Sequence, residues 1–213
     1  QTASKNDIYK DSAFKVIKDL SSKKKGAIFE KIFEEYMTRN GHTIFKPESS
    51  EHDRIVQLKD SDEKLKIEIK GSFLWGDGDK FRFQQIRTNQ DYDFVVFLAV
   101  YTDTINFYIA SKEDTKKNLE VQDEDGNWIY NQHGGKKVNS GTFFIDGFPE
   151  DISWMQELEW WYTKGDVKMA YYELGESVVN RDTLWVGTVV DAADSTEDGT
   201  TESVEIQYED GGK

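Results

Sequence analysis

The sequence predicts an α/β protein in which a mixed central β-sheet is flanked by helices and followed by a C-terminal α+β extension. Apolar residues recur at helical spacing between residues 28 and 36, and several later segments alternate apolar and polar residues as half-buried strands do. Residues 94–100 form a continuous apolar run, which is typical of a fully buried central strand. With 213 residues and 14% aromatic side chains, the chain is long enough to enclose one ordinary core.

The first predicted helix carries an apolar stripe that is expected to face the core. The members of the stripe are Ile28, Phe29, Ile32, Phe33 and Tyr36. Asn40-Gly41 follows the stripe, and a glycine after the last periodic residue commonly ends a helix. Residues 1–23 come before this helix and are expected to form an N-terminal arm, either a helical lead-in or a flexible segment.

Three strands are expected after this helix, and the second and third of them alternate apolar and polar residues. They cover residues 42–46, 54–58 and 65–71. The turn residues Gly76-Asp-Gly78 interrupt the pattern, and a short helix is predicted over residues 81–89. The apolar run at residues 94–100 is then expected to form a hairpin with residues 105–110. This order of elements predicts the mixed sheet.

The pattern is weaker beyond residue 111. A helix is expected to begin at Pro149, because proline is favoured in the first turn of a helix. Its buried stripe would consist of Ile152, Met155 and Leu158. Residues 183–190 and 202–208 are expected to pair as strands, and the alternative is that the end of the chain is a solvated acidic tail.

These elements divide the chain into an arm (residues 1–23), a main domain with inserted loops (24–165) and an acidic C-terminal extension or β-hairpin (166–213). The formal net charge is −14, but it is distributed unevenly. Residues 1–110 carry 18 basic and 18 acidic side chains, whereas residues 111–213 carry 9 and 23. Because phosphate contact needs only a local basic surface, the acidic total does not exclude a nucleic-acid partner.

The composition excludes several classes of site. The chain has no cysteine, which excludes disulfides and cysteine-based metal centres, and its three histidines are scattered. No run approaches the ~20 apolar residues that a membrane-spanning helix needs, so no membrane partner is expected. A cytoplasmic location is the corresponding expectation.

Glu68-Ile-Lys70, in the strand predicted over residues 65–71, carries the chemistry of greatest interest. Positions 68 and 70 point to the same face of a strand. Glu68 can therefore bind a hard cation such as Mg²⁺ while Lys70 orients a water or stabilises charge in the transition state. Asp53 begins the preceding strand and reaches the same edge if the two strands pair. Glu30, on the predicted helix, could complete the carboxylate shell.

In this order the residues resemble the PD-(D/E)XK nuclease superfamily, which has the restriction-endonuclease-like fold. The resemblance covers roughly residues 24–110 and consists of Gly26-Ala-Ile-Phe-Glu30, Asp53, Glu68-Ile-Lys70, Gln84, Gln85 and Arg87. It implies that Asp53, Glu68 and Glu30 bind Mg²⁺, for which Mn²⁺ would substitute. Lys70 would serve the hydrolytic water. A Gln or Arg on the second helix, Gln85 above all, would support the site or contact phosphate.

Two of these assignments have competitors. His52, and not proline, precedes Asp53, so that Glu51 competes with Asp53 for the role of metal ligand. Glu34 lies about one helical turn after Glu30 and competes with it in the same way. The Gly-x-x-x-Glu pattern and the position of Glu30 beside the apolar stripe favour Glu30.

Ordinary structural explanations also exist for the candidate residues. Glu68 and Lys70 could form an exposed ion pair of little energetic value. Gln84, Gln85 and Arg87 could belong to a solvated helix face. The segment Gln132-His-Gly-Gly-Lys-Lys137 suits a loop that contacts DNA through His133, Lys136 and Lys137, and the alternative is a basic turn.

The leading functional hypothesis is a Mg²⁺-dependent DNA endonuclease of the sequence-specific restriction type, which hydrolyses phosphodiester bonds with an activated water. Such an enzyme is expected to act on double-stranded DNA as a homodimer, with one site for each strand. A structure-specific, repair or phage nuclease with the same site is the second hypothesis. The third is an acidic binding protein or DNA mimic without enzymatic activity, which the charge of the second half permits.

Overall fold

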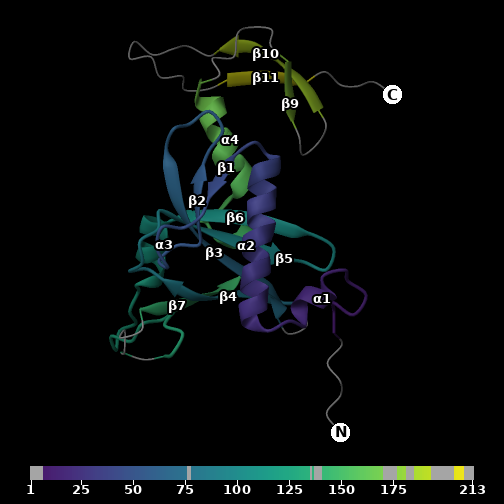
Figure 1. Ribbon diagram of the computed structural model, residues 1–213. Coiled ribbons are helices and arrows are strands. Elements are labelled where there is room, and N and C mark those ends of the chain that lie inside the picture. The colour runs from purple at the N-terminus through teal and green to yellow at the C-terminus, as the bar shows by residue number, and fades with distance from the viewer. Residues whose placement is uncertain are drawn as a thin grey trace. The chain divides into compact units, whose positions relative to one another are not determined.

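The computed structural model describes residues 7–75, 78–134, 136, 141–169, 177–180, 185–192 and 204–208 (Figure 1). The chain separates into two compact units, Gln1–Tyr162 and Thr163–Lys213. All the candidate catalytic residues belong to the first unit. No helix in the described part of the chain is long and apolar enough to cross a membrane.

The first unit contains four helical segments and eight strands among its described residues. In chain order they are α1 (Lys15–Lys18), α2 (Ser22–Arg39), β1 (Thr43–Phe45), β2 (Arg54–Gln57), β3 (Lys64–Trp75), β4 (Lys80–Arg87), β5 (Phe94–Val100), β6 (Ile105–Ser111), α3 (Lys112–Leu119), β7 (Thr142–Gly147), the 3₁₀ turn η1 (Pro149–Asp151) and β8 (Gln156–Glu157). Helix α4 (Leu158–Met169) begins directly after β8. The second unit contains β9 (Ser177–Asn180), β10 (Trp185–Ala192) and β11 (Val204–Tyr208).

The eight strands of the first unit form one mixed sheet, as the sequence predicts. Its main path runs β1-β2-β3-β5-β6-β8, and β4 joins the end of β3 to β7. The pair β3–β5 is parallel, whereas the other pairings of the sheet are antiparallel. The expected hairpin is confirmed, because Phe94–Val100 pairs with Ile105–Ser111 along its length. β3 is the longest described strand. Its first part pairs with β2 and β5, and its last residues, Leu74 and Trp75, pair with β4.

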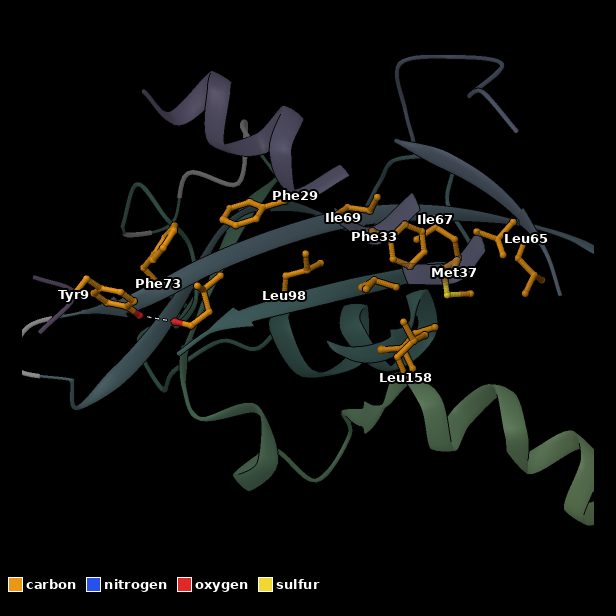
Figure 2. Packing of buried hydrophobic residues seen from close by; sticks show 14 residues of the cluster. Tyr9, Phe29, Phe33, Met37, Leu65, Ile67, Ile69, Phe73, Leu98 and Leu158 are labelled. Atoms are coloured by element: carbon orange, nitrogen blue, oxygen red, sulfur yellow. Dashed lines mark hydrogen bonds between the residues drawn. The ribbon is translucent and has the colours of Figure 1, made fainter. Parts of the chain in front are cut away.

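Helix α2 covers one face of this sheet, as its apolar stripe predicts (Figure 1). Its buried side chains pack against alternate residues of the central strands in one continuous core. Figure 2 shows Phe29, Phe33 and Met37 of the helix close to Leu65, Ile67, Ile69, Phe73 and Leu98 of the strands. The odd-numbered residues Leu65, Ile67, Ile69 and Phe73 of β3 belong to this core, whereas the even-numbered Glu68 and Lys70 do not.

The opposite face of the sheet is covered by a second core, to which β4, β7 and α3 contribute. The helix expected over residues 81–89 is wrong, because this segment is strand β4. The pairing with β7 shifts register between Phe83 and Ile86, and Gln85 in this bulge has a positive φ of 58°. The extra residue changes the spacing of buried side chains from two to three, which imitates a helical pattern while keeping Phe81, Phe83 and Ile86 buried.

The helix expected to begin at Pro149 is also wrong. Only the 3₁₀ turn Pro149–Asp151 forms there, and residues 156–157 pair with β6 at the edge of the sheet before α4 begins at Leu158. The residues of the expected apolar stripe therefore do not share one helix. Met155 ends a turn that begins at Ile152, and Leu158 begins α4. Strand β7 and helix α3 have no counterpart in the sequence-based expectation.

The beginning and the end of the chain add two further findings. Tyr9 lies in the segment expected as an arm, but it is fully buried. Its hydroxyl donates a hydrogen bond to the Val100 carbonyl (Figure 2). It also accepts one from the Leu74 N–H at 2.9 Å. In the second unit, β10 pairs with β11 in antiparallel fashion, which confirms the pairing expected for residues 183–190 and 202–208.

Candidate active site

The pairing of β2 with β3 places Asp53 opposite Glu68. In this antiparallel register Arg54 lies across from Ile67, so the next pair of positions is Asp53 and Glu68. The Asp53 N–H donates to the Ile67 carbonyl at 2.9 Å. Beyond this point β2 has ended, and the Asp53 carboxylate itself accepts a hydrogen bond from the Ile69 N–H at 2.8 Å. A side chain thus replaces the missing backbone partner of β3.

Glu68 and Lys70 form a close pair on one face of β3. The Lys70 Nζ lies 2.6 Å from the Glu68 Oε1, and the two side chains are 18% and 8% exposed. Glu68 is therefore buried and Lys70 is partly buried, which differs from the exposed ion pair of the ordinary explanation. Burial raises the pKa of Glu68 and the charge of Asp53 raises it further, whereas Lys70 and Arg87 act in the opposite direction.

Glu30 approaches the same group of charges from α2. Its carboxylate accepts a hydrogen bond from the Arg54 Nη1 at 3.0 Å, and Arg54 also bonds to Glu34 at 3.2 Å. Burial raises the pKa of Glu30, and so does the negative charge of Asp53, while Arg54 and Lys70 lower it. Asp53 therefore lies within electrostatic range of both Glu30 and Glu68.

The geometry also separates the competing acidic residues. Glu51 is exposed, and its backbone N–H bonds to the Ser49 hydroxyl, whereas Asp53 is bonded to β3. Glu34 pairs with Arg54 and is more exposed than Glu30, with 48% against 31% of the side chain accessible. The structure thus brings Asp53 and Glu30, and not their competitors, toward the Glu68–Lys70 pair.

The carboxylates suit a cation held by two protein ligands and by water. Within the described part of the chain, no three His, Asp or Glu side chains form a cluster with metal-binding geometry. Glu30 is paired with Arg54 instead of completing such a cluster. Mg²⁺ in proteins commonly needs only one or two carboxylates and keeps several waters. The mutual charge of Asp53 and Glu68, one of them buried, provides the negative potential that such an ion would neutralise.

The candidates on the predicted second helix lie on strand β4. Gln84 and Gln85 belong to its bulge, and Arg87 is close enough to Glu68 for its charge to lower the pKa of that carboxyl. The Gln85 N–H donates to the side-chain oxygen of Gln132 at 2.7 Å, which fastens the loop after residue 130 to the bulge. β4 therefore occupies the place that the sequence assigns to a helix.

The remaining loop candidates are more distant from the site. The His133 N–H bonds to Asn131 within its own turn. Lys136 lies near Asp123 and contributes to lowering the pKa of that carboxyl. Lys137 is outside the described residues. The structure consequently links this loop to the site through Gln132, which the sequence does not single out as a contact residue.

Three residues near the site are not among those to which the sequence assigns a role in it. Arg54 forms an ion pair with Glu30. Its position directly after Asp53 is the sequence feature that could have indicated that it lies near the site. His52 is 3% exposed and its Nδ1 bonds to the Asp91 carbonyl at 3.1 Å. Tyr92 is buried, and burial together with the negative charge of Glu68 raises the pKa of its hydroxyl.

A groove of about 580 Å³ begins at Lys70 and is lined by residues of α2, β3 and β4. Its polar and aromatic lining includes Lys18, Ser22, Lys25, Lys70, Ser72, Trp75, Arg82, Gln84 and Gln85. Asp53 and Glu68 are not part of this lining. The site therefore consists of the carboxylates of Asp53 and Glu68 together with Lys70. Lys70 contacts Glu68 and also lines the open groove.

Comparison with known proteins gives a distant structural likeness. No protein-family model and no curated protein sequence matches the chain. Among solved structures, the chain is similar to a bacterial homing endonuclease, I-Ssp6803I, with 19% sequence identity and a TM-score of 0.37. The alignment covers 44% of this chain and 71% of that protein. This likeness is distant and assigns no function to the chain.

Proposed function

We propose that the protein is a metal-dependent endonuclease that hydrolyses phosphodiester bonds in DNA. The observation that carries the proposal is the close pair of the buried Glu68 and the partly buried Lys70 on β3, with Asp53 bonded to the intervening Ile69. A buried charge is retained at a cost in stability, and carboxyl groups with a shifted pKa, such as Glu68, concentrate at functional sites. Their order along the chain is the one that resembles the PD-(D/E)XK nucleases.

Each residue of the site has a role in this proposal. Asp53 and Glu68 would hold a Mg²⁺ ion, for which Mn²⁺ would substitute, and the ion would lower the pKa of a bound water and neutralise charge at the phosphate. The Lys70 ammonium is positioned by Glu68 to orient the attacking water and to stabilise negative charge that develops on the phosphate. Glu30 would support the metal site indirectly, because its ion pair with Arg54 holds that side chain next to Asp53.

Two substrate classes are compatible with this chemistry. The restriction type would act as a homodimer on duplex DNA, and each subunit would cut one strand. A structure-specific nuclease would instead act on DNA with unpaired nucleotides. The groove beside Lys70 favours the second class, because its lining combines cations with an exposed tryptophan. A non-enzymatic acidic protein would need neither the partly buried Lys70 nor the carboxylate pair.

The proposal is tested by incubating supercoiled plasmid with the protein and Mg²⁺. We expect nicked or linear products from the wild type, and a loss of at least 100-fold in rate for Lys70→Ala and for Glu68→Ala, since each removes a charge from the site. Lys66→Ala is the matched control, because Lys66 lies on the same face of β3 but pairs with the exposed Asp91. Cleavage that survives both site substitutions would refute the proposal.

Metal binding gives an independent test against the DNA-mimic hypothesis. We expect calorimetric titration with Mn²⁺ to show binding to the wild-type protein and loss of that binding in Asp53→Ala. A protein that binds no divalent cation would support the non-enzymatic class instead.

A further inference from the structure

The groove beside Lys70 differs in charge from the rest of the protein. The chain carries 41 acidic and 27 basic residues, yet the described residues that line the groove include four cations and no carboxylate. The cations are Lys18, Lys25, Lys70 and Arg82. A basic groove on an acidic protein selects an anionic ligand, and its position next to Lys70 makes that ligand continuous with the candidate active site.

Lys25 is the cation of this groove that is available to a ligand. Lys18 bonds to Asp7, Lys70 to Glu68 and Arg82 to Asp146. Lys25 makes no ion pair with any carboxylate of the described residues, and its Nζ donates to the backbone carbonyl of Lys18 at 3.2 Å. A phosphate in the groove would therefore find one lysine whose charge is not already compensated.

Gly26 has no structural reason to be glycine. It lies inside α2, where glycine costs about 1 kcal/mol relative to alanine. A Cβ at this position would meet no atom of the protein within 4 Å. Gly71 on the other side of the groove is different, because a Cβ there would lie 2.2 Å from the Phe29 ring. Since Gly26 lines the groove, the missing side chain leaves room for a ligand that approaches the helix backbone.

The end of the groove away from the Glu68–Lys70 pair holds an aromatic platform. Trp75 is 45% exposed, and the Arg82 guanidinium lies 5.0 Å from the centre of its ring. Arg82 is itself fixed, because it is bonded to Asp146 and lies 5.0 Å from the Phe144 ring. A tryptophan held in this way offers a rigid surface on which a planar group can stack.

We propose that this groove binds a single nucleic-acid strand, with its phosphates at Lys25 and Gly26 and an unpaired base stacked on Trp75. A cationic groove with an aromatic stacking surface is the usual arrangement for single-stranded nucleic acid. The faces of bases in an intact duplex are covered by their neighbours, so they cannot reach Trp75. The volume of about 580 Å³ is within the range of sites that hold a small ligand, which is enough for an unpaired nucleotide.

This inference rests on the proposed nuclease function and narrows its substrate to DNA that contains unpaired nucleotides next to the scissile bond. A strand bound along the groove would pass Lys70 as it leaves the stacking platform, because both residues belong to β3 and line the same groove. A strand bound in the groove would thereby have a phosphodiester bond next to Lys70. The preference for unpaired DNA would arise because a base stacks on Trp75.

Binding in the absence of divalent cations separates this inference from catalysis. A fluorescently labelled single-stranded 12-nucleotide DNA and a blunt duplex of the same sequence are titrated with the protein in EDTA, and anisotropy is measured. We expect the single strand to bind at least tenfold more tightly than the duplex. Trp75→Ala should weaken single-strand binding by about tenfold or more, whereas Trp75→Phe should retain most of it. Trp160→Ala, which removes an exposed tryptophan outside the groove, is the matched control.

Two further variants test the phosphate end of the groove. Lys25→Ala should weaken binding and reduce the slope of log K against log salt by about 0.7, the value for one phosphate contact with a single strand. Lys24→Ala should leave the slope unchanged, since Lys24 is exposed and does not line the groove. Gly26→Phe should abolish binding without loss of helical circular dichroism, because the new side chain occupies open space.

The outcomes distinguish the two proposals. Equal affinity for single strand and duplex, together with unchanged binding by Trp75→Ala and Gly26→Phe, would overturn the groove inference even if the plasmid is cut. Single-strand binding that depends on Trp75, Lys25 and Gly26 would support the inference even if no cleavage occurs.

Discussion

The Asp53 carboxylate accepts a hydrogen bond from the Ile69 backbone N–H at 2.8 Å, and this contact joins two candidate catalytic segments. It occurs where β2 has ended and β3 continues without a neighbour on that edge. Ile69 is the residue between Glu68 and Lys70, so the bond holds their strand in register with Asp53. The same carboxylate therefore has a structural role and a proposed role as a metal ligand.

Substitution of Asp53 is expected to separate these two roles. Asp53→Asn keeps an oxygen that can accept from Ile69, so its free energy of unfolding should stay close to that of the wild type. Asp53→Ala leaves the N–H of the buried Ile69 without its partner and should lower the free energy of unfolding by about 1–3 kcal/mol. Urea denaturation measures this difference, and both variants should lose Mn²⁺ binding in calorimetry. Equal stability of the two variants would contradict the structural role of Asp53.

Metal binding is expected to depend on pH through Glu68. Burial and the charge of Asp53 raise the pKa of Glu68 above its ordinary value of 4.5, so the folded protein binds this proton more tightly than the unfolded chain. The contribution of Glu68 to the free energy of unfolding therefore falls as pH rises from 4.5 through the raised pKa. An ion at Glu68 must displace the proton, so affinity for Mg²⁺ should weaken as pH is lowered through the same range.

Calorimetry in buffers of different ionisation enthalpy measures this effect directly. Proton release on Mg²⁺ binding should appear near the raised pKa of Glu68 and disappear well above it. Glu68→Gln should lose both the Mg²⁺ binding and the proton release, since it removes the carboxylate that binds the ion and the proton. Binding that is independent of pH between about 4.5 and 7 would contradict the assignment of Glu68 as a ligand.

Glu30 and Glu34 provide a matched pair of substitutions on one helix. Both bond to Arg54, but the Asp53 charge raises the pKa of Glu30, which is also the more buried of the two. Glu30→Gln should lower kcat/KM for DNA cleavage by about tenfold or more, because it changes the charge next to Asp53. Glu34→Gln should stay within about threefold of the wild type, which is the scale of a surface charge change. The reverse order of effects would transfer the supporting role to Glu34.

Gly71 is expected to be required by packing. Its φ is not in the left-handed region, but a Cβ would overlap the Phe29 ring of α2 at 2.2 Å. Gly71→Ala should therefore lower the free energy of unfolding by about 1–3 kcal/mol, as overpacking of a core does. Gly26→Ala, in α2 across the groove, is the control, and it should raise the thermal midpoint because the helix gains a better residue without a clash. Similar midpoints for both variants would show that Phe29 moves without cost.

The sequence determines much of the order and spacing of this fold. The apolar stripe of α2 and the buried run of β5 have periodicities that allow one structural interpretation, and both elements form where expected. The alternation in residues 65–71 also determines that Glu68 and Lys70 share a face, because the side-chain period of a strand is two. These are local properties, so the chain itself is sufficient to predict them.

Other features depend on contacts between distant segments. The bulge at Gln84 and Gln85 adds one residue to β4, and only the pairing of β4 with β7 distinguishes the resulting spacing from that of a helix. The burial of the Glu68–Lys70 pair, the choice of Asp53 over Glu51 and the role of Arg54 likewise follow from how β2, β3 and α2 meet. The basic groove depends on the same packing, because Lys18 and Lys25 are separated from Trp75 by about fifty residues of sequence that includes many carboxylates. The sequence by itself therefore determined which residues could perform the chemistry, and the tertiary structure decided which of them lie together, since burial and electrostatic range exist only after the chain has folded.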